Sequence, residues 1–282
     1  MREDVCSTMG VEPMSNFQGV ENTLFIPLEA RIFVSEKFPE HFYDEKALLL
    51  AKHIPNDSIR KKSSEYSFMA SVARYYNTDA MTKAFLSQHK RCNIIYLGAG
   101  FETAYHRLRG EDMQGVFFYD VDLPEVIDAR RALLGSGMNE VLIGCDMFHL
   151  DWANNIDTML PSLLIVSGVF QYFAEEKVVL FIKALQNIFV HAELIFDATN
   201  KTGLAYANKY VKKTGNTDAL MHFYVNDSAL FAKTVDAPLI EDRLFFADAR
   251  KTLGHRLEVY TRIAMTVVDK HKRAVLVHLR LN

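Results

Sequence analysis

Two glycines after a short apolar run are the first residues whose spacing suggests chemistry. Gly98, Ala99 and Gly100 end a run that begins at Asn93. Glycine lets the backbone turn sharply and approach a ligand without a Cβ atom in the way. Helical signals follow from 103 to 108, and the free N–H groups of a helix start attract polar ligand atoms. An ordinary turn between a strand and a helix has the same composition, so the motif needs support from other residues.

Carboxylates at the ends of the next two apolar runs supply that support. Asp120 closes the run 115–119, roughly 20 residues after the glycines, where an acid can accept hydrogen bonds from ribose hydroxyls. Asp122 can share or take over that role. Asp146 follows the third run and can meet an adenine amino group, with Met147 as apolar cover, although it can also cap a short helix. The joint pattern predicts a nucleoside site.

Thr103 bears on which nucleoside cofactor binds. A dinucleotide fingerprint has a third glycine at this place, where helix and strand pack closely beneath a pyrophosphate. S-adenosylmethionine has no pyrophosphate, so this requirement does not apply to it. The pattern therefore favours S-adenosylmethionine, and a nicotinamide cofactor is the alternative.

The elements that position these residues alternate along the chain. Buried strands are predicted from short apolar runs at 93–97, 115–119, 141–143, 163–166 and 194–196. Helical segments at 124–134 and 174–190 separate some of them. Alternating strands and helices predict βαβ units with right-handed crossovers. Upstream, helices are predicted at 29–37, 45–53, 67–76 and 79–88, with Asp79 as the N-cap of the last.

The end of the chain breaks the alternation. Residues 257–268 and 274–281 are β-rich, and the polar segment 269–272 joins them, which predicts an antiparallel hairpin. The predicted fold class is α/β: a class I methyltransferase Rossmann-like sheet, mostly parallel, with a C-terminal antiparallel hairpin and an N-terminal helical lid. We expect one domain over 1–282, with the lid at 1–90, the core at 91–282 and an acceptor-side insertion at about 200–255.

Composition limits the setting and the partners. The formal net charge of −3 argues against a general nucleic-acid binder. Cys6, Cys92 and Cys145 form no CxxC pair, which fits a reducing cytoplasmic setting. No apolar run approaches the length of a membrane span, and no histidine motif predicts a metal. We therefore expect a soluble protein with a small-molecule partner, no nucleic acid and no membrane, as a monomer or homodimer.

The motifs together resemble the leucine carboxyl methyltransferase family, in particular its bacterial polyketide O-methyltransferase branch. The resemblance rests on NIIYLGAGFETAYHRL at 93–108 and VFFYDVDLPEVIDARR at 116–131, with support from 24–31, 43–47 and 167–173. It covers roughly residues 22–200.

The resemblance implies roles for residues at the cofactor. Arg74 would bind the methionine carboxylate through its guanidinium fork. The remaining cofactor-binding residues would be Gly98, Ala99, Gly100, Asp120, Asp122, Asp146, Met147 and the position of Ser167. The family usually has glutamate at that last position, and serine carries no charge, so affinity is reduced, another acid compensates, or the activity has changed. Tyr172 matches the tyrosine of the same family motif.

The acceptor side is less defined. Tyr172, Tyr206, Tyr210, His222 and Tyr224 are candidates for lining an acceptor pocket at the carboxyl edge of the sheet. A carboxylate acceptor needs no base, whereas a phenol benefits from one. The leading hypothesis is an S-adenosylmethionine-dependent O-methyltransferase acting on a carboxylate or phenolic hydroxyl of a small molecule. A non-catalytic S-adenosylmethionine-binding protein and a nicotinamide-dependent oxidoreductase are the alternatives.

Overall fold

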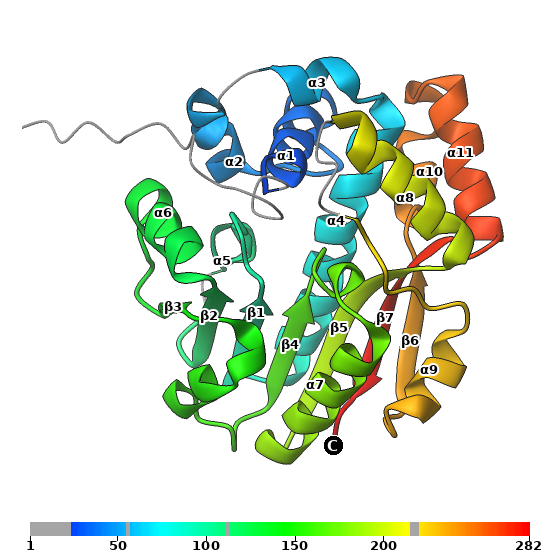
Figure 1. Cartoon of the computed structure of the whole chain (residues 1–282). Helices are drawn as coiled ribbons and strands as arrows, with labels where there is room; N and C mark the ends of the chain where they lie inside the picture. The colour runs from blue at the N-terminus through cyan, green and yellow to red at the C-terminus, as the bar shows by residue number, and fades with distance from the viewer. Residues whose placement is uncertain (1–23, 55–56, 111–112, 215–219) are drawn as a thin grey trace, which may run out of the picture.

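The computed structural model describes residues 24–54, 57–110, 113–214 and 220–282, and their strands form one sheet. The strands are β1 (Cys92–Leu97), β2 (Val116–Asp122), β3 (Glu140–Gly144), β4 (Ser162–Val166), β5 (Ala192–Thr199), β6 (Leu239–Leu244) and β7 (Ala274–Arg280). Their order is β3-β2-β1-β4-β5-β7-β6 (Figure 1). The first five strands are parallel, and β7 pairs antiparallel with both β5 and β6. The prediction of a mostly parallel sheet with an antiparallel end is confirmed.

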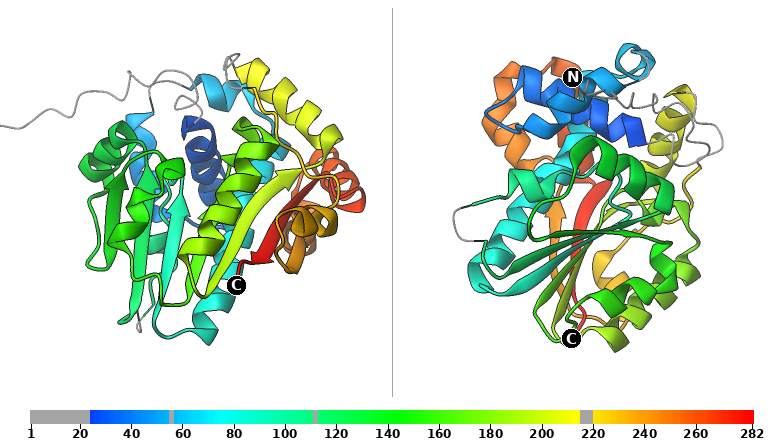
Figure 2. Two further views of the ribbon diagram at one scale, coloured as in Figure 1. Left: turned by 60° about the horizontal axis from the view of Figure 1, so that its bottom comes forward. Right: turned by 90° about the vertical axis from the view of Figure 1, so that its left-hand side faces the viewer.

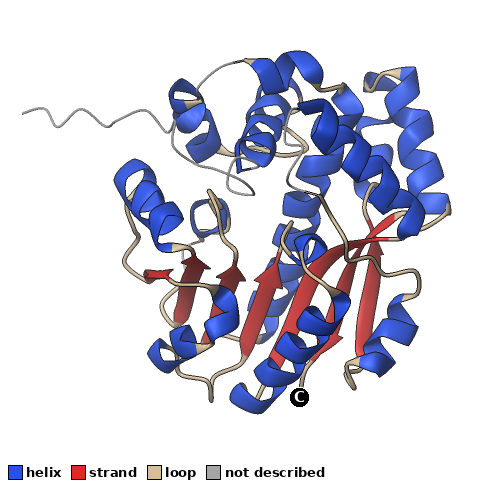
Figure 3. Ribbon diagram, in the orientation of Figure 1, coloured by secondary structure: helices blue, strands red, loops and turns tan. Residues whose placement is uncertain are grey.

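Helices cover both faces of this sheet (Figure 3). They are α1 (Phe25–Lys37), α2 (Glu45–Leu50), α3 (Ser58–Lys62), α4 (Glu65–Gln88), α5 (Ala104–Arg107), α6 (Pro124–Leu134), α7 (Glu175–Ile188), α8 (Lys201–Thr214), α9 (Ser228–Thr234), α10 (Ala247–Leu253) and α11 (Val259–Lys270). Within the described residues, none of these helices combines the length and the apolar character that a membrane crossing requires.

Alternate residues of β1 show how the two layers are held. Ile95 and Leu97 belong to the core that contains α7, whereas Ile94 and Tyr96 belong to the core that contains α4. Successive side chains of a strand point to opposite faces, so a strand that is apolar throughout must be covered on both sides. All five predicted parallel strands are present with bounds that differ by a few residues at most.

The prediction of a strand at 257–268, as the first strand of a C-terminal hairpin, is wrong. Residues 259–270 form helix α11, and the strands that pair antiparallel with β7 are β5 and β6, which both lie earlier in the chain. The segment has many β-branched residues, which favour strands by propensity. Its buried Thr261, Met265 and Val268 nevertheless share one face at helical spacing. Packing of this face against α4 and β7 outweighs the propensity.

The predicted break between two N-terminal helices is also wrong. Residues 65–88 form the single helix α4, and Asp79 lies within it. Asp79 accepts hydrogen bonds from the Arg107 guanidinium at 2.8 and 2.9 Å instead of capping a helix. Asn77 donates to the carbonyl of Phe245 at 2.9 Å. Tertiary contacts therefore stabilise a continuous helix across a polar stretch whose sequence predicts a break.

Buried ion pairs join the N-terminal helices to the sheet. Asp44, the N-cap of α2, lies 2.8 Å from Arg31 of α1 and 3.1 Å from Arg107 of α5. Although burial opposes the charge, the two guanidinium groups and Thr103 lower the pKa of Asp44 to about 2. The cluster holds α1 and α2 beside the turn that follows β1.

The segments predicted as lid and insertion also belong to the layers of the fold. Helices α1–α3 lie above one edge of the sheet, opposite the end marked C in the right view of Figure 2. In the same N-terminal region, α4 contacts β4 and β7. The segment 200–255 contributes α8 and also strand β6 of the sheet. These elements surround the carboxyl ends of the parallel strands, where α/β proteins bind ligands.

Candidate functional site

A cavity of about 1170 Å³ opens at the carboxyl ends of the parallel strands. Its walls come from the strand ends on one side and from α1, α4, α8 and α11 on the other. Eleven of the predicted site residues line it, from six separate parts of the chain: Arg74, Gly98, Ala99, Gly100, Asp122, Asp146, Met147, Ser167, Tyr172, Tyr206 and Tyr210. Typical ligand pockets occupy about 300–1,000 Å³, so this cavity has room for a cofactor and a second molecule.

The glycine turn after β1 has the conformation that its sequence predicts. Gly98 and Gly100 have φ values of +71° and +52°, which favour glycine. The N–H groups of Gly98 and Ala99 donate to the carbonyl of Val121 at 2.8 and 3.1 Å. A Cβ atom on Gly98 would lie 2.5 Å from Cγ2 of Val169. The turn therefore lets three chain segments meet at the cavity wall.

Asp122 is the acid that β2 presents to the cavity. Its Oδ2 accepts from the N–H of Gly100 at 2.6 Å, and its Oδ1 accepts from the N–H of Leu123 at 2.7 Å. Burial raises the pKa of Asp122 above its usual value, although these two N–H groups oppose the shift. Each carboxylate oxygen can accept a further hydrogen bond. Asp122 can therefore serve a ligand hydroxyl while it remains fixed in place.

Asp120 does not line the cavity. Strand β2 continues to Asp122, so Asp120 lies two residues below the edge of the sheet. Its Oδ2 is 2.5 Å from Nη2 of Arg130 on α6, and Glu140 of β3 lies 3.2 Å from the same nitrogen. Of the two predicted ribose-side acids, only Asp122 reaches the cavity.

Asp146 and Met147 follow β3 at the same edge. Asp146 Oδ1 accepts from the N–H of Phe148 at 2.9 Å and caps the 3₁₀ helix Met147–His149. Asp146 thus combines the capping role that its sequence allows with a position in the cavity wall. Met147 is buried, and its carbonyl accepts from Nε1 of Trp152 at 2.7 Å. This part of the wall offers one carboxylate beside an apolar surface.

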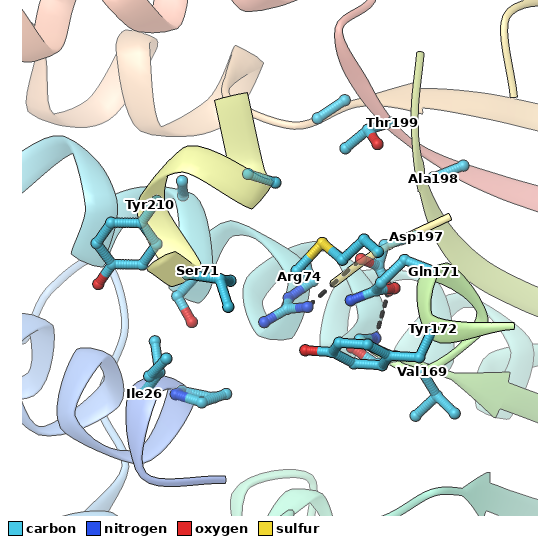
Figure 4. A pocket seen from close by; sticks show the side chains of 18 of the residues that line it. Ile26, Ser71, Arg74, Val169, Gln171, Tyr172, Asp197, Ala198, Thr199 and Tyr210 are labelled. Carbon is cyan, nitrogen blue, oxygen red and sulfur yellow. Dashed lines mark hydrogen bonds and ion pairs between the residues drawn. The ribbon is translucent and has the colours of Figure 1, made fainter. Parts of the chain in front are cut away.

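Arg74 and Asp197 form an ion pair in the cavity wall (Figure 4). Nη1 of Arg74 lies 3.4 Å from Oδ2 of Asp197, and Oδ1 of Asp197 accepts from the N–H of Gly168 at 2.5 Å. Burial alone would lower the pKa of Arg74, but Asp197 and nearby tyrosines raise it above its usual value. Arg74 is therefore a buried guanidinium that remains charged.

The sequence does not single out Asp197 as a site residue, although it ends the fifth apolar run. Ser167 lies at the end of the neighbouring strand and also lines the cavity. The register pairs Val166 with Phe196, so the next residues along the two strands, Ser167 and Asp197, are neighbours. This relation between β4 and β5 appears only once the strand order is known.

The residues predicted for the acceptor side separate into two groups. Tyr172, Tyr206 and Tyr210 line the cavity, and Tyr210 forms a hydrogen bond of 2.6 Å with Ser63. His222 and Tyr224 do not line it. Phe223 between them does, and neighbouring side chains in an extended segment point in opposite directions.

Further lining residues come from elements that the sequence gave no reason to connect. They are Tyr66 of α4, Phe245 and Phe246 between β6 and α10, Tyr260 of α11, and Arg273 just before β7. No motif unites them, because they meet only through the packing of α4, α8 and α11. Among the described residues, no group of His, Cys, Asp and Glu side chains could hold a metal ion.

Solved structures support the fold. A candidate methyltransferase from Thermobifida fusca has a TM-score of 0.56 at 16% identity, over 89% of this chain and 93% of that one. A DUF574 family protein from Streptomyces avermitilis has a TM-score of 0.55 at 13% identity, over 89% and 96%. At such identities the likeness concerns the fold alone.

Sequence relatives identify the family. The chain is 24% identical over 201 residues to the tetracenomycin polyketide synthesis O-methyltransferase TcmP of Streptomyces glaucescens, over 71% of this chain and 74% of the relative. It is 25% identical over 158 residues to rat leucine carboxyl methyltransferase 1, over 45% of this chain and 47% of that relative. The chain thus aligns with about half the length of the rat protein.

A model of one family covers more than half of the chain. The leucine carboxyl methyltransferase model matches residues 22–186, which include the predicted cofactor residues but not Asp197. This match overturns the nicotinamide-dependent alternative and confirms S-adenosylmethionine as the expected cofactor. The chain therefore belongs to the leucine carboxyl methyltransferase family and is an S-adenosylmethionine-dependent methyltransferase.

Proposed function

We propose that this methyltransferase transfers the methyl group of S-adenosylmethionine to a carboxylate oxygen of a small, apolar and aromatic molecule. The observation that carries the proposal is one cavity that joins two different chemical environments. Acids and glycine turns surround one part, and aromatic side chains with one arginine surround the other. A methyl donor and its acceptor must lie side by side for transfer.

The first part of the cavity fits S-adenosylmethionine. Nε of Arg74 and Oγ of Ser71 are buried side-chain atoms without a hydrogen-bond partner among the described residues, and both residues line the cavity on α4. Unpaired buried polar atoms are costly, so a ligand carboxylate here would satisfy them. In this proposal Asp122 accepts from the ribose hydroxyls, and Asp146 with Met147 holds the adenine. Gly98, Ala99 and Gly100 lie between these two ends.

The second part of the cavity favours an aromatic acceptor. Its wall contains Tyr66, Tyr206, Tyr210, Phe246 and Tyr260. Aromatic side chains stack well on planar ligands and contribute large apolar contacts. Tyr206 and Tyr260 are more than half exposed, so the apolar wall continues to the mouth of the cavity. These features support a small-molecule acceptor rather than a nucleic acid.

Arg273 favours a carboxylate over a phenol. It lines the acceptor part, and no carboxylate of the described chain forms an ion pair with its half-buried guanidinium. A guanidinium binds carboxylates well because its N–H groups match the two oxygens. We propose that Arg273 binds one carboxylate oxygen and thereby directs the other towards the methyl group.

Among the described residues, the wall also offers neither a histidine nor an unengaged acid as the base for a phenol. No histidine of the described chain lines the cavity, and its acids are Asp122, Asp146 and Asp197, each already bonded to a backbone N–H. Burial raises the pKa of Tyr66 to about 12, so this hydroxyl stays protonated near neutral pH. A carboxylate is already ionised there and needs no proton acceptor. When bound, S-adenosylmethionine supplies an electrophilic methyl group, and the chain aligns the acceptor and excludes water.

Two matched compounds test the proposal. The purified protein is titrated with S-adenosylhomocysteine by calorimetry and then incubated with radiolabelled S-adenosylmethionine and either 2-naphthoate or 2-naphthol. Methyl 2-naphthoate without the naphthol ether supports the proposal, whereas preferential ether formation overturns the carboxylate assignment. Binding without transfer to either compound, or to wider panels of acids and phenols, would instead favour the non-catalytic alternative.

A further inference from the structure

Arg74 and Asp197 lie farther apart than a well-formed ion pair. Their contact of 3.4 Å exceeds the 2.7–2.9 Å or so of charge-assisted hydrogen bonds between nitrogen and oxygen. Both side chains are nearly buried, with 15% and 10% of their surface exposed. Nε of Arg74 has no partner among the described residues. Both residues line the cavity, and they therefore retain hydrogen-bonding capacity that their contact with each other does not use.

Asp197 holds its position through a contact that leaves Oδ2 available. The N–H of Gly168 donates to Oδ1 at 2.5 Å, while Arg74 is the contact of Oδ2. Gly168 has a φ of +76°, and a Cβ atom there would lie 2.6 Å from Nη1 of Arg74. Glycine at 168 thus allows the backbone, the guanidinium and the carboxylate to meet in one place.

The other cavity acids lie at the far end of the strand order. Asp122 ends β2 and Asp146 follows β3, whereas Asp197 lies near the end of β5, beyond β1 and β4. An adenosyl group at β2 and β3 therefore places the amino-acid part of the same ligand towards β4 and β5. Ser167 provides no charge at that end, and its neighbour Asp197 does.

We propose that Asp197 accepts a hydrogen bond from the α-ammonium group of S-adenosylmethionine while Arg74 binds the α-carboxylate. This inference rests on the proposed cofactor site. The amino-acid part of the ligand is a zwitterion, with one carboxylate for Arg74 and one ammonium group for Asp197. Each residue can therefore exchange the long contact with the other for a shorter charge-assisted hydrogen bond to the ligand. The ammonium group also balances the charges of the site, because a ligand carboxylate alone would leave Arg74 shared between that carboxylate and Asp197. Asp197 thus takes the place of the acid absent at Ser167.

The test compares two ligands in two proteins. Calorimetry measures the affinity of the wild type and of Asp197→Asn for S-adenosylhomocysteine and for its deamino analogue, which retains the carboxylate. We expect the wild type to prefer the amino ligand by about tenfold to a hundredfold. In Asp197→Asn this preference should nearly disappear, mainly through weaker binding of the amino ligand. An unchanged preference overturns the inference.

Further variants separate a charge effect from a folding effect. Ser167→Glu in the Asp197→Asn background returns a carboxylate to the neighbouring strand end and should restore part of the preference. Asp197→Glu keeps the charge and should retain a preference even if Asp197→Asn does not fold, which circular dichroism would reveal. Loss of the preference in a folded Asp197→Glu protein, with none regained in the double variant, contradicts the role of the charge.

The outcomes distinguish this inference from the proposed function. Asp122→Asn should weaken both ligands equally, because both carry the same ribose. If the wild type binds both ligands and Asp197→Asn keeps the preference, the cofactor site stands and the ammonium role of Asp197 falls. If the folded wild type binds neither ligand, both proposals fail.

Discussion

Arg130 of α6 and Asp120 of β2 form a buried ion pair of 2.5 Å that holds the carboxylate below the edge of the sheet. Glu140 lies 3.2 Å from the same guanidinium nitrogen, so two carboxylates share one cation. Burial, with the charge of Glu140, raises the pKa of Asp120 to about 7 despite Arg130. The residue that most resembles a ribose ligand in the sequence therefore joins two strands and a helix instead.

This site should make stability depend on pH. An aspartate in an unfolded chain has a pKa of about 4, so between about pH 4 and pH 7 the folded protein retains a proton that the unfolded chain releases. The contribution of Asp120 to stability then falls as the pH rises through this range. Asp120→Asn removes this titratable group. The free energy of unfolding of the variant, relative to that of the wild type, should therefore increase as the pH rises. Urea unfolding at several pH values measures the difference.

Asp128→Asn is the matched control, because it removes an exposed carboxylate from the same helix α6. A difference between wild type and Asp120→Asn that stays constant from about pH 4 to pH 8 would contradict the raised pKa.

Gly98→Ala should destabilise the turn after β1. The φ of +71° is unfavourable for alanine, and the new Cβ atom would lie 2.5 Å from Cγ2 of Val169. Strained backbone of this kind costs about 1–3 kcal/mol. Urea unfolding should show a loss of that size. Gly110→Ala is the control, since a Cβ atom there meets nothing within 4 Å; equal stability of the two variants would refute the explanation.

Arg74→Ala should weaken S-adenosylhomocysteine binding. Loss of one partner from a buried, hydrogen-bonded charge pair costs about 2 kcal/mol or more, which corresponds to about 30-fold in affinity. Arg74→Lys should restore only part of it, because an ammonium lacks the bidentate geometry. Calorimetry measures both variants, with Arg262→Ala as an exposed control on α11.

A second ligand makes this experiment specific. 5′-Methylthioadenosine lacks the amino-acid part, so the wild type and both Arg74 variants should bind it equally. A comparable loss of affinity for this ligand would show that Arg74 maintains the structure of the pocket rather than binding the carboxylate.

Arg273→Met should separate acceptor binding from cofactor binding. With an aromatic carboxylate as acceptor, we expect its KM to rise about tenfold because a charge-assisted contact is lost. The KM for S-adenosylmethionine should change little, since Arg273 precedes β7 and lies in the proposed acceptor part of the cavity. Steady-state kinetics with Arg273→Lys and Arg262→Met for comparison would check this. An unchanged acceptor KM would remove Arg273 from the acceptor site.

The parallel strands and the glycines and acids that follow them could be predicted, because each is marked by a local pattern of residues. Strands buried on both faces must be apolar throughout, and five such runs identify the parallel sheet. The glycines at 98–100 and the acids Asp122 and Asp146 follow those runs, and parallel strands end at one edge, so their approximate location follows from the sequence.

Tertiary structure alone decided which side chains face the cavity. Strand β2 extends three residues beyond the predicted end at 119, which buries Asp120 against Arg130. Packing makes 259–270 a helix despite its β-branched residues, and thereby brings Tyr260 to the wall of the cavity. Asp197 and Arg74 lie far apart in the sequence and meet only because β5 is the neighbour of β4 and α4 packs against β4 and β7. Long-range packing determines such contacts, and no local pattern of residues encodes them.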